Sequence, residues 1–287
     1  MRPRTFTLAA ALAAALPLAP VPARADETPQ PTEALKAALG KAAQYESYAF
    51  TATVERARPG GRERPQGGGG AAAPIEGRYA REQASWIKSG DTELIVLGDD
   101  MVARTGGGQW SRLAEPAGPG QGGQRARGRQ QGWGNPAWRL ARMTLPHAEL
   151  AILANGIAEA KAPQADGALQ RYTASLQAEA VRRLVPRAGG GRRSGGQDPN
   201  AEPPRASGEL TVWVDQQGRV TRYEYTAHLK IALRGREFEF QTTRKVQLSG
   251  IGETAVEVPE AARKALEGTA PGGGQQPPQD EDDGGVI

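Results

Sequence analysis

Near the start of the chain, after its N-terminal region, the apolar residues are spaced as in an amphipathic helix. Over 32–46 they recur every three or four residues, and Thr32 stands where an N-cap is expected. The stretch 136–160 has the same helical character, and Pro146 is placed to begin a second helix there rather than to interrupt one. A short helix is expected over 260–266. The pattern therefore predicts helices before, within and after the other elements.

Between these helices the pattern has the two-residue period of strands. Phe50, Ala52 and Val54 alternate with polar residues over 48–56, which indicates a half-buried strand. The other candidate strands are 76–82, 84–88, 92–97, 101–105, 210–214, 220–233 and 237–248. Short turns join several neighbouring strands, which favours an antiparallel sheet. Helices and antiparallel strands together predict an α+β fold.

Glycine and proline are concentrated outside these elements. The chain has 287 residues, and 25 of its 38 glycines fall in the four segments 57–74, 114–136, 186–208 and 268–287. Such low-complexity stretches bury too little apolar surface to offset the entropy of ordering. We expect three flexible, Gly/Arg-rich insertions and a disordered tail. About 172 residues remain, a length that suits a single domain.

The N-terminus resembles a secretory signal peptide. Residues 1–25 have a basic start at Arg2 and Arg4, an apolar run over 7–18, and a small-residue cleavage site that ends at Ala25. The apolar run is shorter than the roughly 20 residues that span a membrane. We therefore expect export to the periplasm, cleavage near Ala25 and no transmembrane anchor.

Composition narrows the chemistry. The chain has no cysteine, which excludes disulfides, thiolate zinc sites, iron–sulfur clusters and a cysteine nucleophile. Its two histidines, His147 and His228, have no metal-ligand neighbour at helical spacing and are interpreted as surface or satisfied side chains. The match to G-x-G-x-x-G over 118–123 lacks the strand and helix that a dinucleotide site needs. We predict a non-enzymatic protein with no catalytic residue, cofactor or metal.

Two arginine-rich runs contain no acidic residue. One lies over 117–147 and the other over 182–193. They are either solvated loops or contacts to an anionic envelope surface such as lipid headgroups. Because an exported protein meets little RNA, nucleic acid is not expected as a partner.

The apolar residues of the sheet and of the mid-chain helices have two interpretations that do not exclude each other. They can form a filled core, or they can line a hydrophobic cavity between a curved sheet and its helices. The candidate ligand-binding residues are Phe50, Val54, Trp86, Leu94, Val96, Val102, Trp110, Trp138, Met143 and Leu145.

In this order of elements the chain resembles the LolA/LppX-like lipoprotein-localisation superfamily over residues 32–267. The resemblance rests on Tyr45-Glu-Ser-Tyr-Ala-Phe50 before the first strand, on Gly106-Gly-Gly-Gln-Trp110, on the run 212–222, and on Val256-Glu-Val-Pro259 before the last helix. It implies a curved antiparallel sheet, an incomplete β-barrel, wrapped around the N-terminal helix and mid-chain lid helices, with the lid over 133–160.

The resemblance also implies a function. Proteins of this superfamily carry an acyl chain or another lipid through the periplasm on the concave face of the sheet. We therefore expect a carrier that binds a lipid, or the acyl chain of a lipoprotein, without covalent chemistry. The alternative is an envelope interaction or sensor module that uses the same fold and its basic loops and transports no lipid.

Overall fold

The computed structural model describes residues 30–57, 73–113, 135–185, 205–233 and 236–268, with only the backbone given for 231–233 and 236. The predicted signal peptide, nearly all of the tail and most of each predicted insertion lie outside these residues. Of the insertion 186–208, the last four residues belong to a strand that begins at Arg205.

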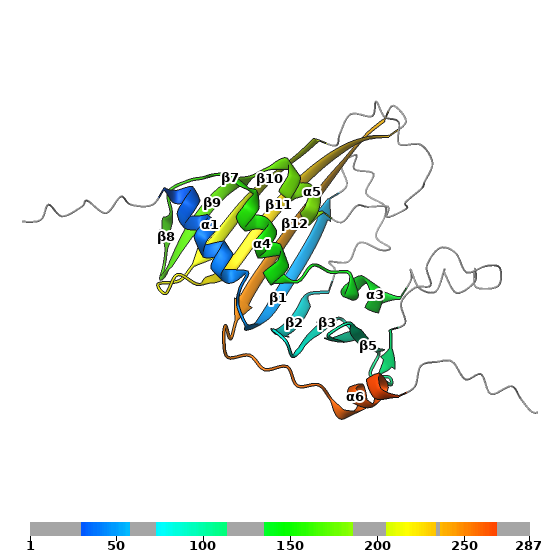
Figure 1. The fold of residues 1–287 in the computed structure, drawn as a ribbon. Helices are drawn as coiled ribbons and strands as arrows, with labels where there is room; N and C mark the ends of the chain where they lie inside the picture. The colour runs from blue at the N-terminus through cyan, green and yellow to red at the C-terminus, as the bar shows by residue number, and fades with distance from the viewer. Residues whose placement is uncertain (1–29, 58–72, 114–134, 186–204, 234–235, 269–287) are drawn as a thin grey trace, which may run out of the picture.

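A 12-stranded sheet dominates the fold (Figure 1). Its strands are β1 (Ser47–Ala57), β2 (Ile75–Ala80), β3 (Ala84–Ser89), β4 (Thr92–Leu97), β5 (Asp100–Thr105), β6 (Ser111–Arg112), β7 (Ile157–Ala160), β8 (Gln164–Asp166), β9 (Leu169–Leu176), β10 (Arg205–Val214), β11 (Val220–Leu233) and β12 (Arg236–Ser249). The strand order is β6-β5-β4-β3-β2-β1-β12-β11-β10-β9-β7, with β8 paired to β9, and the pairs are antiparallel. The order begins at β6 and ends at β7 without closing, which confirms the predicted open antiparallel sheet.

The two faces of the sheet are covered by different helices. We call the face that carries Phe50 and Val54 in β1 the inner face, and the opposite one the outer face. The helices are α1 (Pro31–Ala42), α3 (Pro136–Ala141), α4 (Pro146–Gly156), α5 (Ala178–Leu184) and α6 (Glu260–Glu267). In Figure 1, α1, α4 and α5 lie across β9–β12, whereas α6 lies beside β5 at the other end of the sheet, where it also contacts β6.

Apolar burial explains this arrangement. The largest core cluster joins α1, α4 and α5 to the inner face of β1 and β9–β12. A second cluster packs Ala137 and Leu140 of α3 against the inner face of β3–β5. A third packs Ala262 of α6 against Ile95 and Val102 on the outer face. Strands β4 and β5 are therefore buried on both faces, whereas the long strands β10–β12 have helices on one face only.

Two local expectations were wrong, Thr32 as the N-cap of the first helix and the helical state of residues 157–160. The first helix begins at Pro31 with Gln30 as N-cap, because proline is already set for the first helical position. Thr32 instead accepts a hydrogen bond from the Ala160 N–H through its Oγ1, at 3.0 Å. Residues 157–160, expected to be helical, form strand β7, in which Ile157 pairs with Leu176 of β9.

A glycine in β2 is required by close packing on the inner face. A Cβ at Gly77 would overlap the ring of Phe50 and lie 3.0 Å from the backbone oxygen of Trp86. Phe50 is buried in the main cluster and cannot turn away freely. We expect Gly77→Ala to lower the free energy of unfolding by about 1–3 kcal/mol, the usual cost of overpacking, as measured by urea denaturation.

The matched control is Gly40→Ala in α1, where an added Cβ meets no atom within 4 Å. Alanine is a better helix former than glycine by about 1 kcal/mol, so this variant should be as stable as the wild type or more so. Equal destabilisation by both variants would contradict the packing described for Gly77.

Candidate functional site

The ten predicted ligand-binding residues do not share one surface. Phe50 and Val54 lie on the inner face of β1, and Leu94 and Val96 lie on the same face of β4. From the segment opposite this face come Trp138, Met143 and Leu145. The remaining three, Trp86, Val102 and Trp110, belong to the outer-face cluster under α6.

Part of the inner-face group lies where the two inner-face clusters meet. Ile75 of β2 packs against both inner-face clusters, as do Met143 and Leu145 from the connection between α3 and α4. Each of these three side chains is only partly buried. Val54 is also partly buried. It is the next inner-face residue of β1 after Ala52, which pairs with Ile75. The apolar surface at this junction is therefore incompletely covered by the helices.

The outer-face group is held in a different environment. The indole N–H of Trp86 donates to Glu93 at 3.3 Å, and Arg104 pairs with Glu93 at 3.0 Å. The Arg104 guanidinium also lies 4.8 Å from the centre of the Trp110 ring. The separation from the inner group follows from the strand geometry, because successive side chains of a strand point to opposite faces.

A buried polar cluster ties α4 to the sheet. Glu149 of α4 is 2 % exposed and Arg244 of β12 is 5 % exposed. Arg244 Nε lies 3.0 Å from Glu149 Oε2 in an ion pair, without the alignment of a hydrogen bond. Arg244 Nη2 donates to the Thr144 carbonyl at 3.3 Å, and the Tyr223 hydroxyl donates to Glu149 Oε2 at 2.6 Å. These contacts fix the first turn of α4 over β11 and β12.

Burial controls the ionisation of this cluster. Desolvation raises the pKa of Glu149, and Arg244 and Tyr223 offset part of that rise. For Arg244, desolvation favours the neutral form, but Glu149, Tyr223 and Tyr225 together outweigh it and the pKa lies above its usual value. Desolvation also raises the pKa of Tyr223 well above its ordinary range. Glu149 is thus the member that can exchange a proton, since arginine keeps its charge in proteins.

A second polar contact lies beside the first. The backbone N–H of His147 donates to the Tyr48 hydroxyl at 3.1 Å, and His147 Nδ1 lies 2.9 Å from the same oxygen. The imidazole stacks on the ring of Tyr79, with centroids 4.2 Å apart. Burial, and then the charge of Arg81, lower the pKa of His147. This geometry is consistent with a neutral imidazole whose Nδ1 accepts a hydrogen bond from the Tyr48 hydroxyl.

The sequence analysis did not identify this cluster, although two signals for it were present. Glu149 falls in the same helical stripe as the apolar Pro146 and Leu153. Arg244 alternates with Val246 and Leu248, so it occupies an inward position of its strand. Both are charged residues at positions where the pattern calls for an apolar one, and buried charges are normally paired.

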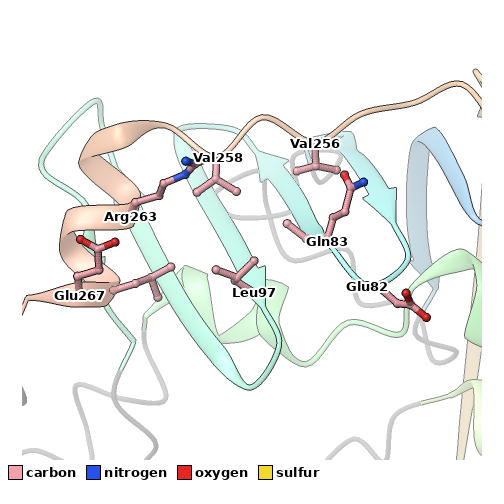
Figure 2. Close-up of a pocket in the computed structure, with 9 residues that line it drawn as sticks. Glu82, Gln83, Leu97, Val256, Val258, Arg263 and Glu267 are labelled. Carbon is pink, nitrogen blue, oxygen red and sulfur yellow. The ribbon is translucent and has the colours of Figure 1, made fainter.

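A groove of about 450 Å³ lies on the outer face, between the sheet and the C-terminal segment (Figure 2). Its apolar lining comprises Ala84, Leu97, Val256, Val258 and Leu266. Glu82, Arg263 and Glu267 add charges of both signs, with Glu82 and Glu267 at opposite ends of the groove (Figure 2). The groove thus combines an apolar lining with charged residues, on the face of the sheet opposite to Phe50 and Val54.

Within the described ranges, no group of three or more histidine or acidic side chains is placed to hold a metal ion. No helix in the same residues is long and apolar enough to cross a membrane.

Comparison with known proteins finds similarity in structure only. No protein-family model matches the sequence, and no curated protein does. Among the 14 solved chains that match is a LolA superfamily protein from Nitrosomonas europaea, with 10% identity and a TM-score of 0.27 over 78% of this chain and 94% of that one. A DUF1329 family protein from Desulfovibrio piger matches with 9% identity and a TM-score of 0.23, over 77% and 92% of the two chains.

A LolA superfamily structure is thus among those that this chain is similar to, as its sequence led us to expect. At these TM-scores the similarity assigns no function.

Proposed function

We propose that this protein is a periplasmic carrier that binds a lipid, or the acyl chain of a lipoprotein, non-covalently on the inner face of its sheet. The main support is the partly covered apolar surface at Ile75, Met143 and Leu145, which joins the two inner-face clusters. Val54 extends this surface along β1. The protein needs no covalent chemistry for this role.

Burial of an acyl chain supplies enough free energy for such a site. Each methylene removed from water contributes about 0.8 kcal/mol. Met143 is unbranched and flexible, so it can adapt to the shape of a bound chain. A modest opening between the α3–α4 connection and the strands would therefore suffice for binding.

The test is uptake of a fluorescent fatty-acid analogue by the purified protein. We expect saturable binding, and we expect Val54→Glu to weaken it at least about tenfold, because the new carboxylate, next to Arg56 and opposite Arg244, would place charged, hydrated groups where the acyl chain lies. Urea denaturation of the variant would confirm that it remains folded, as expected for a partly buried position.

The matched control is Thr53→Glu, in the same strand but on the outer face, next to the outer-face residue Lys245. It should bind like the wild type. If the wild type takes up no analogue, and no lipid co-purifies with it, the carrier function is wrong and the envelope interaction module becomes the better interpretation. Equal weakening by both variants would place the site elsewhere.

A further inference from the structure

Charge is nearly absent from the inner face of the sheet. Of the strand residues whose side chains the structure describes, only Arg56 and Arg244 place a charge there. Both are arginines, and they lie on the adjacent strands β1 and β12, where Val54 pairs with Arg244 and Arg56 with Thr242. An inner face that is otherwise apolar or uncharged thus carries two cations side by side.

The two arginines differ in their surroundings. Arg244 is buried and neutralised by Glu149 at 3.0 Å. Arg56 is exposed, and no ion pair with another described residue involves it. Burial raises the pKa of Tyr225, and the charge of Arg56 is among the effects that oppose this rise, so Arg56 acts on the same part of the inner face.

The position of Arg56 relative to the apolar surface suggests a role. It follows Val54 at the next inner position of β1, and Val54 follows Ala52, the partner of Ile75. Inner positions of one strand are about 6.6 Å apart, at about 3.3 Å per residue. A ligand that lies over Ile75 and Val54 would therefore bring one end close to the Arg56 guanidinium.

We propose that the carrier site is selective for an anionic single-chain lipid, whose chain lies over Val54 and Ile75 and whose terminal carboxylate pairs with Arg56. This inference depends on the proposed function, because it specifies the ligand of the same site. Guanidinium matches a carboxylate with parallel N–H donors, and such charge-assisted hydrogen bonds are stronger than neutral ones. Arg244 is buried and neutralises Glu149. The negative charge of Glu149 therefore does not repel the carboxylate of the ligand.

The experiment compares hexadecanoic acid with hexadecanol, which has the same chain length and no charge, by displacement of a fluorescent fatty-acid analogue. We expect the wild type to bind the acid about two- to fivefold more tightly than the alcohol, the usual contribution of one solvent-exposed ion pair. Arg56→Gln should remove this preference by weakening binding of the acid alone. Arg56→Lys should keep part of it.

The matched control is Arg222→Gln, since Arg222 lies on the outer face over the ring of Trp213. It should leave the preference unchanged. An acid-to-alcohol ratio that Arg56→Gln does not alter would overturn the proposed carboxylate contact while leaving the carrier function intact. Failure of the wild type to bind either compound would overturn the carrier function itself, and this inference with it.

Discussion

Replacement of Glu149 by glutamine is expected to lower the free energy of unfolding by about 3–5 kcal/mol, the usual cost of breaking a buried ion pair from one side. The variant keeps the size of the side chain but leaves the Arg244 guanidinium buried at 5 % exposure without its counterion. Arginine cannot lose its proton to escape this cost. Urea denaturation at neutral pH measures the effect.

The reciprocal variant, Arg244→Met, should be less costly and should depend on pH. It leaves the Glu149 carboxyl, whose pKa burial already raises and which can become neutral by taking a proton. Between the ordinary glutamate pKa of about 4.3 and the raised pKa of Glu149 in the folded state, the folded protein then binds more protons than the unfolded protein. Stability should therefore be fully present below that pH and be lost as the pH rises through the folded-state pKa.

Two further variants separate the ion pair from general packing. The double variant Glu149→Leu with Arg244→Met replaces both charges by apolar groups, so it should recover much of the loss. Glu260→Gln removes one member of the exposed pair with Lys264 and should change stability little. If Glu149→Gln were no more costly than Glu260→Gln, the buried cluster would not stabilise the fold.

Ala262→Asp is expected to detach α6 from the outer face. Ala262 is fully buried against Ile95 and Val102, so the new carboxylate would be desolvated without a partner. We expect a loss of about 3 kcal/mol, the upper end of the usual range for single substitutions. Trp86 and Trp110, which pack against the same cluster, should become more exposed, with a red shift of tryptophan fluorescence.

The neighbouring residue provides the control. Ala261 is exposed in the first turn of α6, where a negative charge interacts favourably with the helix dipole. Ala261→Asp should therefore leave both stability and fluorescence unchanged. Identical fluorescence and stability in the two variants would show that α6 does not protect these tryptophans.

Much of the local structure could be predicted from the sequence because it depends on residues close together in the chain. Strand β4 (Thr92–Leu97) and strand β11 (Val220–Leu233) have the predicted bounds. Alternation also assigned Phe50 and Ala52 to the buried side of β1, which the structure confirms. In each of these elements the period of two follows from strand geometry alone.

Other elements carried a weaker signal. The short helix α5 (Ala178–Leu184) and the strand β9 (Leu169–Leu176) were not predicted. The β9 residues alternate only in part, and α5 is too short to show a clear helical period. In β4, Leu94 and Ile95 are both fully buried, because α3 covers one face and α6 the other.

The sequence by itself determined the type of most elements, the antiparallel open sheet and the side of each strand that is apolar. Only the tertiary structure decided which helix covers which face, and so divided the ten candidate ligand residues between two surfaces. It also brought Glu149 to Tyr223, 74 residues away in the chain. Periodicity records which side of an element is buried, but the partner of that side is set by packing between elements distant in sequence.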